Sequence, residues 1–242
     1  MRTIGLLGGM SWESSLHYYR LINEEVRRRL GGLHSARLVL YSVDFQPIER
    51  MQAEGRWDDA GAALGDAAAQ LERGGADLVV LCTNTMHKVA PAIEARVAIP
   101  LLHIADATGA AIRGRGLQRV GLLGTRFTME QPFYRARLAE RFGLDVITPP
   151  DADRQRVHDV IYEELCLGRV EDRSRDDYRR IAAALVARGA EGLIFGCTEI
   201  MMLLGQRDVA VPAFDTTALH AIAAVDHALA GTERSAADPQ TA

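Results

Sequence analysis

Two short stretches of the chain place a thiol directly after an apolar run. Residues 79–87 read VVLCTNTMH and contain Cys82 followed by Thr83, whereas residues 193–200 read LIFGCTEI and contain Cys197. A thiol is a workable acid or base because its ordinary pKa, about 8.5, lies close to neutral pH, and a helix N-terminus lowers that pKa. Two such groups on opposite faces of one carbon atom would exchange a proton at a stereocentre.

An internal repeat indicates which residue of the first stretch corresponds to Cys197. Three segments of the first half recur in the same order in the second half: IGLLGGMS at 4–11 and VGLLGTRF at 120–127, RGGADLVVLCTNT at 73–85 and ARGAEGLIFGCTEI at 187–200, and IPLLHIADAT at 99–108 and VPAFDTTALH at 211–220. When the Gly-Ala pairs of the second match are aligned, Thr83 falls opposite Cys197, and Cys82 falls opposite Gly196. A one-residue step along a strand turns a side chain to the other face. The repeat therefore predicts that Thr83 faces the site and that Cys82 is a buried thiol.

Short apolar runs alternate with longer amphipathic stretches along the chain. Strands are predicted at 2–7, 37–43, 77–82, 100–104, 118–123, 144–147, 191–196 and 211–214. Helices are predicted at 12–30, 57–74, 86–95, 106–113, 129–141, 153–167, 174–188 and 216–230. This alternation is typical of parallel sheets with helices on both faces. With the repeat, it predicts an α/β protein of two pseudo-symmetric domains, each a mostly parallel sheet flanked by helices, with the active site in the interdomain cleft.

The repeat also suggests domain boundaries. Residues 1–105 together with 210–230 are expected to form the first α/β domain, and residues 106–209 the second. The small, polar residues 231–242 predict a disordered tail. In parallel α/β sheets, ligands bind beyond the carboxyl ends of the strands, where helix N-termini present free N–H groups. The functional residues are therefore expected at those strand ends.

Composition and charge narrow the possible partners. The 242 residues carry a formal net charge of −4 and no broad basic field, which argues against nucleic acid as a partner. The N-terminal apolar stretch is too short for a signal peptide or a membrane span. The sequence therefore predicts a cytoplasmic protein with no membrane partner. In that reducing compartment the three cysteines are expected to be free thiols.

Common cofactor motifs are missing from the sequence. A pyridoxal phosphate enzyme needs a lysine for its Schiff base, and Lys88 is the one lysine of the chain. Gly5, Gly8 and Gly9, in and just after the first predicted strand, have the wrong spacing for a dinucleotide fingerprint, and there is no Gly-Lys-Ser/Thr phosphate loop. Nor does any His/Cys cluster have metal-ligand spacing. The sequence predicts chemistry without a cofactor and without a metal ion.

A set of segments in order resembles the aspartate/glutamate racemase family, the cofactor-independent amino-acid racemases. They cover nearly the whole chain and read TIGLLGGMSWESSLHYYRLINE, DFQPIE, LCTNTMHKV, IPLLHIADAT, GLLGTRFTMEQPFYR, FGCTEI and VPAFDTT. The resemblance implies two α/β domains around a cleft, a homodimer, and a small-molecule amino-acid substrate. It also implies a two-base 1,1-proton transfer at the α-carbon without pyridoxal phosphate.

One position departs from the family's usual pattern. Where the family reads Cys-Asn-Thr-x-His, this chain has Thr83 in place of the first catalytic cysteine, and Cys197 matches the second. A threonine at that position resembles the branch of the family specific for L-aspartate and L-glutamate. A hydroxyl is a far weaker acid than a thiol, so Thr83 is a poor base but can offer a proton to a carbanion. Cys197 is therefore the expected base, and turnover of the two enantiomers is expected to be asymmetric.

The resemblance also implies a set of substrate-binding residues. They are Met10, Gln52, Asn84, Thr85, Glu164, Thr198 and Glu199. The family commonly grips the side-chain carboxylate of the substrate with a basic residue where this chain has Gln52. Glu164 stands near the place of a family lysine that helps to bind a carboxylate. An acidic residue there would repel an acidic side chain or bind an amine, so the substrate is less closely defined than the reaction.

Two other functions remain open from the sequence. Decarboxylation or cis-trans isomerisation of a small dicarboxylate occurs in the same broad superfamily, and single-cysteine members use one thiol for stereospecific protonation. A non-catalytic amino-acid-binding sensor is the second alternative, because the chain lacks half of the usual catalytic pair. Substrate tests with malonate- or maleate-type acids distinguish the first, and ligand binding without α-proton exchange distinguishes the second.

Overall fold

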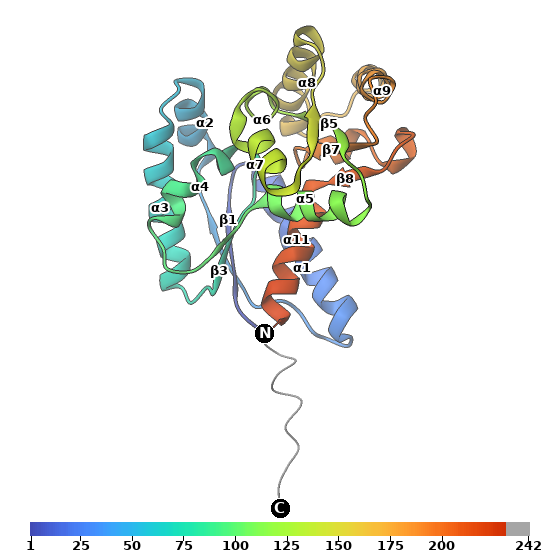
Figure 1. Cartoon of the computed structure of the whole chain (residues 1–242). Helices are drawn as coiled ribbons and strands as arrows, with labels where there is room; N and C mark the ends of the chain where they lie inside the picture. Colours follow the sequence, from blue (N-terminus) through green and yellow to red (C-terminus); the bar gives the residue numbers. More distant parts are fainter. Residues whose placement is uncertain (231–242) are drawn as a thin grey trace, which may run out of the picture. The chain divides into compact units, whose positions relative to one another are not determined.

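The computed structural model describes residues 1–230, which form two compact units (Figure 1). Among the described residues, the first unit comprises Met1–Cys82, Val89–His103 and 220–230, and the second comprises Thr83–Lys88 and Ile104–Leu219. Each unit contains one four-stranded parallel sheet. Among residues 1–230, none of the helices combines the length and the apolar character that crossing a membrane requires.

The first sheet has the strand order β2-β1-β3-β4, and all of its neighbouring strands run parallel. Its strands are β1 (Ile4–Gly8), β2 (Leu38–Ser42), β3 (Leu78–Leu81) and β4 (Leu101–Leu102). The two central strands, β1 and β3, are buried throughout and consist of apolar residues and glycine. Strands covered by helices on both faces require such continuous apolar runs. All four strands predicted for this half of the chain are present.

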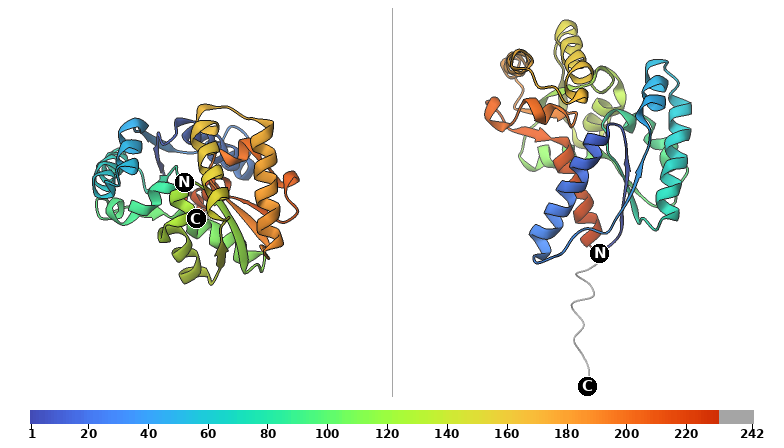
Figure 2. Two further views of the ribbon diagram at one scale, coloured as in Figure 1. Left: turned by 90° about the horizontal axis from the view of Figure 1, so that it is seen from above. Right: turned by 180° about the vertical axis from the view of Figure 1, so that it is seen from behind.

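Helices cover both faces of the first sheet. They are α1 (Trp12–Leu30), α2 (Phe45–Ala53), α3 (Trp57–Arg73), α4 (Ala90–Glu94) and most of α11 (Thr216–Leu229). On α1, Tyr18, Ile22 and Val26 recur every four residues and share a core with apolar side chains of α11 and the sheet. α3 packs against β1 and β2 from the other face, as the views from above and behind also show (Figure 2).

Cys82 belongs to the core between α1, α11 and the first sheet. Leu78, Val80 and Cys82 alternate along β3 and its carboxyl end, and all three lie in that core. The Cys82 thiol is fully buried and donates a weak hydrogen bond to the Val80 carbonyl at 3.6 Å. Burial raises the pKa of the Cys82 thiol far above its usual range. The prediction that Cys82 is a buried thiol is confirmed.

The second sheet repeats the topology of the first, with the strand order β6-β5-β7-β8 and parallel pairing throughout. Its strands are β5 (Arg119–Gly124), β6 (Asp145–Ile147), β7 (Gly192–Gly196) and β8 (Ala213–Asp215). β1 and β5 begin the first matched segments, and β3 and β7 lie in the second. The identical strand order confirms that the chain consists of two similarly built α/β halves.

The helices of the second unit pack in two groups against its sheet. They are α5 (Ile104–Gly114), α6 (Arg126–Glu130), α7 (Pro132–Phe142), α8 (Asp151–Glu163), α9 (Asp172–Ala187) and α10 (Ile200–Leu203), with short 3-10 turns at η2 (Leu165–Leu167) and η3 (Gln206–Asp208). α5 packs on α7, and α8 packs on α9. Tyr134 of α7 and Tyr178 of α9 are fully buried in the core of this unit.

The predicted helices differ from the structure at several places, of which α2 and the stretch 129–141 are two. α2 was not predicted; its first turn contains Pro47, which is tolerated there, and Asp44 caps the helix by accepting the Gln46 N–H at 3.2 Å. The predicted helix at 129–141 is in fact two helices, α6 and α7, separated by Gln131. Pro132 starts the second of them, since a proline cannot continue the first.

The boundary between the units also differs from the prediction. β8 pairs with β7, so residues 213–215 belong to the second sheet, although the stretch 210–230 was assigned to the first domain. The chain passes back to the first unit only at His220, inside α11. Thr83–Lys88 likewise groups with the second unit, because its side chains bond to residues of that unit, as described below. The predicted disordered tail, 231–242, lies outside the described residues.

Candidate active site

The segment that follows β3 is tied by hydrogen bonds to the second unit. The Asn84 amide donates from Nδ2 to Thr216 Oγ1 at 3.1 Å, and the Thr216 hydroxyl in turn donates to the Phe195 carbonyl at 2.9 Å. Phe195 lies in β7, two residues before Cys197. These bonds connect the half-buried Thr83, which directly precedes Asn84, to β7, the strand that Cys197 directly follows.

A pair of threonine hydroxyls adds a second connection to the start of α11. Thr198 Oγ1 lies 3.1 Å from Thr217 Oγ1, so Asn84 and Thr198 bind consecutive residues at the start of α11. Consecutive Cα atoms are only about 3.8 Å apart. The residues that follow Thr83 and Cys197 are therefore anchored side by side, within one unit.

Asp215 holds the start of α11 in place. Its Oδ1 accepts the backbone N–H groups of Thr217 at 2.9 Å and Ala218 at 3.1 Å. This is the capping arrangement that satisfies the free N–H groups of a first helical turn. The sequence repeat pointed to the VPAFDTT segment, but it did not indicate that Thr216 and Thr217 bond to the candidate site residues.

Thr85 connects the same segment to the carboxyl end of β5. Its hydroxyl oxygen lies 3.0 Å from Thr125 Oγ1, which lies 3.2 Å from Thr128 Oγ1. Thr125 also caps α6 by accepting the Thr128 N–H at 3.3 Å. All three threonines are buried, so their hydroxyls form a short chain of hydrogen bonds shielded from water.

His87 fixes the backbone of Thr83. The ring is buried within the 3-10 helix η1 (Thr85–Val89), with Nδ1 2.8 Å from the Thr83 carbonyl and Nε2 3.2 Å from the Ile104 N–H. A backbone N–H only donates and a carbonyl only accepts, so Nε2 is the acceptor and Nδ1 carries the proton. The neutral ring thus clamps the Thr83 carbonyl to the start of α5.

Cys197 forms a close pair with a carboxylate. Its half-buried thiol donates to Glu199 Oε2 at 2.9 Å, and the Glu199 residue is only 6% exposed. Burial raises the pKa of the Cys197 thiol well above its usual range, and the negative charge of Glu199 raises it further. The backbone N–H of Glu199, at the N-terminus of α10, lowers this pKa as expected, but burial and the carboxylate outweigh that effect.

Glu164 is engaged by neighbouring polar groups. Ser174 Oγ donates to its Oε2 at 2.5 Å, and Arg156 lies 3.6 Å from its Oε1. The buried Tyr178 hydroxyl donates to the Val157 carbonyl at 2.8 Å. Burial raises the pKa of this hydroxyl.

Two of the predicted binding residues belong to the first unit. Met10 follows β1, and Gln52 lies in the last turn of α2. Both side chains are buried. The other seven predicted site residues lie in the second unit: Thr83, Asn84, Thr85, Glu164, Cys197, Thr198 and Glu199.

One buried acceptor at this site has no hydrogen-bond partner among the described residues. Asn84 is 5% exposed, and its Oδ1 accepts no hydrogen bond, although Nδ2 is bonded to Thr216. A buried carbonyl oxygen without a donor destabilises a fold by about 1–3 kcal/mol, so native structures rarely leave one unsatisfied without a functional reason. An N–H donor of a bound ligand would satisfy it.

Metal and cofactor ligands are a separate question. Within residues 1–230, no three His, Cys, Asp or Glu side chains gather as a metal ion would require. Lys88 lies half-buried in η1, and burial lowers its pKa.

The fold and the site together define an α/β protein of two repeated halves, with a thiol–carboxylate pair at the carboxyl end of a parallel strand. The chain belongs to the Asp/Glu/hydantoin racemase family, whose model matches residues 7–224.

Known structures and proteins are similar over almost the full length. The crystal structure of a proposed Asp/Glu racemase from Yersinia pestis is 58% identical, with a TM-score of 0.89, and the match covers 95% of this chain and all of that one. The aspartate racemase homologue from Pyrococcus horikoshii OT3 is 34% identical, with a TM-score of 0.82 and coverage of 94% and 99%. A broad specificity amino-acid racemase from Bacillus subtilis is 24% identical, and the match covers 94% of this chain and 98% of that protein. Family and neighbours support an amino-acid racemase, an isomerase.

Proposed function

We propose that the protein racemises an acidic amino acid, L-glutamate or L-aspartate, by a two-base 1,1-proton transfer at the α-carbon. Cys197 is the base on one face, and Thr83 acts on the opposite face. The observation that carries the proposal is the Cys197–Glu199 pair, in which a thiol and a buried carboxylate lie 2.9 Å apart. The matches to Asp/Glu racemases support the substrate class.

The pair explains how a thiol with a raised pKa serves as a base. At rest the thiol is protonated and hydrogen-bonded to Glu199. When substrate is bound, Glu199 takes the S–H proton, and the resulting thiolate removes the α-proton of the substrate. The C–H electron pair remains on the α-carbon as a carbanion, delocalised into the α-carboxylate. Proton transfer by positioned groups of this kind contributes typically 10²–10⁴-fold to a rate.

Thr83 completes the reaction from the other face. Its hydroxyl donates a proton to the carbanion, and the C–H bond formed there inverts the stereocentre. The alkoxide left on Thr83 then regains a proton from solvent, and Glu199 releases to solvent the proton that it took from the thiol, so both groups return to their resting states. Because a hydroxyl is a poor base, the reverse reaction starts less readily from this side. His87 contributes by holding the Thr83 carbonyl, which restrains the position of the Thr83 side chain.

The unsatisfied acceptor of Asn84 supports an amino-acid ligand. An α-ammonium group is a cationic donor, and it would satisfy the buried Oδ1. We assign Thr85, Thr198 and Glu199 to the same binding shell. Met10 and Gln52 are also proposed as substrate-binding residues, as the family resemblance implies. Glu164 is proposed to influence side-chain choice, with its charge partly balanced by Arg156.

The proposal is tested by chiral chromatography of L-glutamate and L-aspartate after incubation with the protein. Wild type is expected to form the D enantiomer, and Cys197→Ser is expected to abolish conversion. An active Cys197→Ser variant would contradict the assignment of the base. Substrate that binds by calorimetry without exchanging its α-proton would favour the sensor, and CO2 release from a malonate would favour the decarboxylase.

We also propose that the protein is a homodimer that functions in the cytoplasm. Trp12, Leu16 and Tyr19 are 63%, 59% and 50% exposed and lie on one face of α1, at the spacing of successive helical turns. Apolar surface of this kind marks protein–protein contacts. Light scattering is expected to give a dimer mass for wild type and a monomer mass for Leu16→Glu.

The proposed cytoplasmic location is supported by the cysteines. Three free cysteines suit a reducing compartment.

A further inference from the structure

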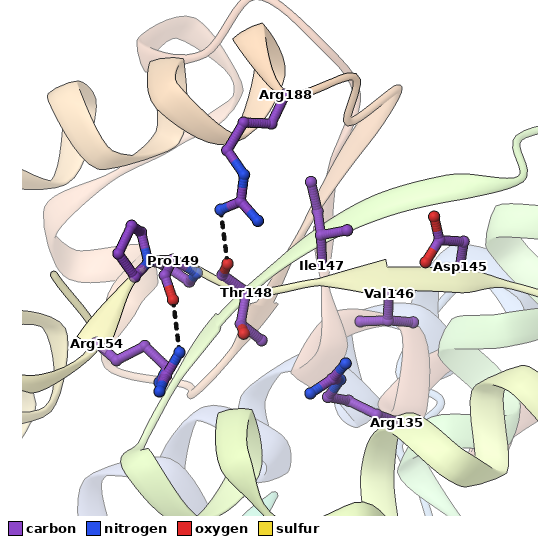
Figure 3. A pocket seen from close by; sticks show the side chains of 9 residues that line it. Arg135, Asp145, Val146, Ile147, Thr148, Pro149, Arg154 and Arg188 are labelled. Atoms are coloured by element: carbon purple, nitrogen blue, oxygen red, sulfur yellow. Dashed lines mark hydrogen bonds between the residues drawn. The ribbon is translucent and has the colours of Figure 1, made fainter.

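A pocket of about 390 Å³ opens along the outer edge of the second sheet. It lies beside β6, which pairs on one side only, with β5. Three arginines from three elements line it: Arg135 of α7, Arg154 of α8, and Arg188, which follows α9. Figure 3 shows their guanidinium groups around the carboxyl end of β6. None of the candidate active-site residues lines this pocket.

Two of the guanidinium groups are held by backbone carbonyls. Arg188 donates to the Thr148 carbonyl at 2.8 Å, and Arg154 donates to the Pro149 carbonyl at 2.8 Å (Figure 3). A carbonyl restrains the direction of a guanidinium without neutralising its charge. Each arginine keeps further N–H donors for another acceptor, because a guanidinium carries five. The forks are therefore oriented before any ligand binds.

The charges in the pocket are only partly balanced. Arg154 pairs with Asp151 at 2.7 Å and with Glu130 at 3.2 Å. By contrast, no carboxylate of the described residues lies within 4.0 Å of Arg135 or Arg188. Asp145, on the pocket wall, is itself paired with Arg119 at 3.2 Å.

The walls between the arginines are apolar. Val146, Ile147 and Pro149 are buried and contribute to the lining, and the half-buried Thr148 adds a hydroxyl. Oriented guanidinium forks bind carboxylate and phosphate oxygens in a bidentate manner, and a single such contact is stronger than a neutral hydrogen bond. A ligand with two or more negative charges would bind both Arg135 and Arg188, whose charges no nearby carboxylate balances.

We propose that this pocket binds a small organic polyanion, either a phosphorylated compound or a polycarboxylate, at a site separate from the Cys197–Glu199 pair. Oxyanion chemistry is common to both kinds of ligand. Inorganic pyrophosphate and citrate serve as probes that distinguish the two sources.

Isothermal titration calorimetry of the full-length protein tests the proposal. Wild type is expected to bind pyrophosphate or citrate, and Arg135→Ala is expected to weaken that binding by about tenfold or more, as the loss of a charged hydrogen-bonding partner does. Arg135 makes no hydrogen bond or ion pair among the described residues, so its removal leaves the fold intact. The control, Arg37→Ala, removes an exposed arginine of the first unit and is expected to bind as wild type does.

The second variant, Arg135→Ala with Arg188→Gln, is expected to abolish the binding heat. A thermal unfolding curve of this variant checks that the loss of the Arg188–Thr148 bond has not unfolded the protein. Tighter binding of pyrophosphate would assign the pocket to phosphorylated ligands, and tighter binding of citrate to polycarboxylates. Equal affinity of wild type and Arg135→Ala, or no binding of either probe by wild type, would overturn the proposal.

Discussion

The Cys197 thiol lies 2.9 Å from Glu199 Oε2, with only one residue between them in the sequence. The carboxylate has two opposite effects on the thiol. It raises the thiol pKa, so little thiolate exists in the resting protein, and it provides an acceptor for the thiol proton once substrate is bound. The base of the proposed reaction is thus the pair, and the predictions for the two residues differ.

Glu199→Gln removes the acceptor while keeping the shape of the side chain. Conversion of L-glutamate is expected to fall roughly 100- to 10,000-fold, the usual contribution of a positioned proton-transfer group. At the same time, the thiol pKa is expected to fall, because a raising charge is lost. Iodoacetamide alkylation of Cys197, followed against pH in a Cys166→Ser background, is expected to begin at lower pH. The control is Glu191→Gln, at an exposed carboxylate that has no part in the proposed reaction. Identical pH profiles for Glu199→Gln and the protein with Glu199 intact would contradict the pairing.

The Thr83 side of the site predicts unequal exchange of the two enantiomers. In D2O, the substrate whose α-hydrogen faces Cys197 is expected to take up deuterium faster, and the resemblance to the L-specific branch assigns this to the L form. Thr83→Cys supplies a second thiol and is expected to bring the two initial rates closer together. Mass spectrometry of each enantiomer gives the rates. Equal initial rates of deuterium uptake for the two enantiomers with wild type would contradict the proposed asymmetry.

His87 is predicted to be a positioning residue. His87→Asn retains a donor near the Thr83 carbonyl, whereas His87→Leu leaves that carbonyl and the Ile104 N–H without partners. The Leu variant is expected to lose about 1–3 kcal/mol of stability and most of kcat. The Asn variant is expected to recover part of kcat, with KM little changed in both. If kcat of the two variants fell equally, while their stabilities differed, the contact with Thr83 would have no role in turnover.

His220 predicts that the first unit loses stability in mild acid. The ring is buried between the Tyr18 hydroxyl, at 2.9 Å, and the Leu102 carbonyl, at 2.8 Å, and burial lowers its pKa from 6.5 to about 4. Between these two pH values the unfolded chain binds a proton that the folded protein does not. The free energy of unfolding therefore falls as the pH drops from about 6.5 to 4, by about 3 kcal/mol in all.

Urea unfolding at several pH values measures this loss. His220→Gln keeps polar atoms near both partners but does not titrate, so its stability is expected to change less over the same range. His34→Gln, at an exposed histidine, is the control and is expected to follow wild type. A His220→Gln curve parallel to that of wild type would show that other groups cause the acid sensitivity.

Much of the fold was predictable because its signals are local. Each of the eight strands is an apolar run flanked by turn residues, and the repeated segments revealed two halves before their common strand order was known. α2 was not predicted; its first turn contains Pro47, and whether a proline fits a helix depends on where that helix begins. The assignment of β8 was wrong for a different reason, since no local pattern states which neighbour a short strand will choose.

The candidate site was likewise predictable only in part. The sequence by itself determined which residue types stand at the strand ends: the repeat separated Thr83 from Cys82 and matched it to Cys197, because side-chain direction alternates regularly along a strand. Only the tertiary structure decided that the Thr83 segment belongs with the second unit and that Glu199 raises the pKa of Cys197. Those outcomes depend on hydrogen bonds such as Asn84 to Thr216, between residues far apart in the chain, and on burial, which no single stretch of sequence specifies.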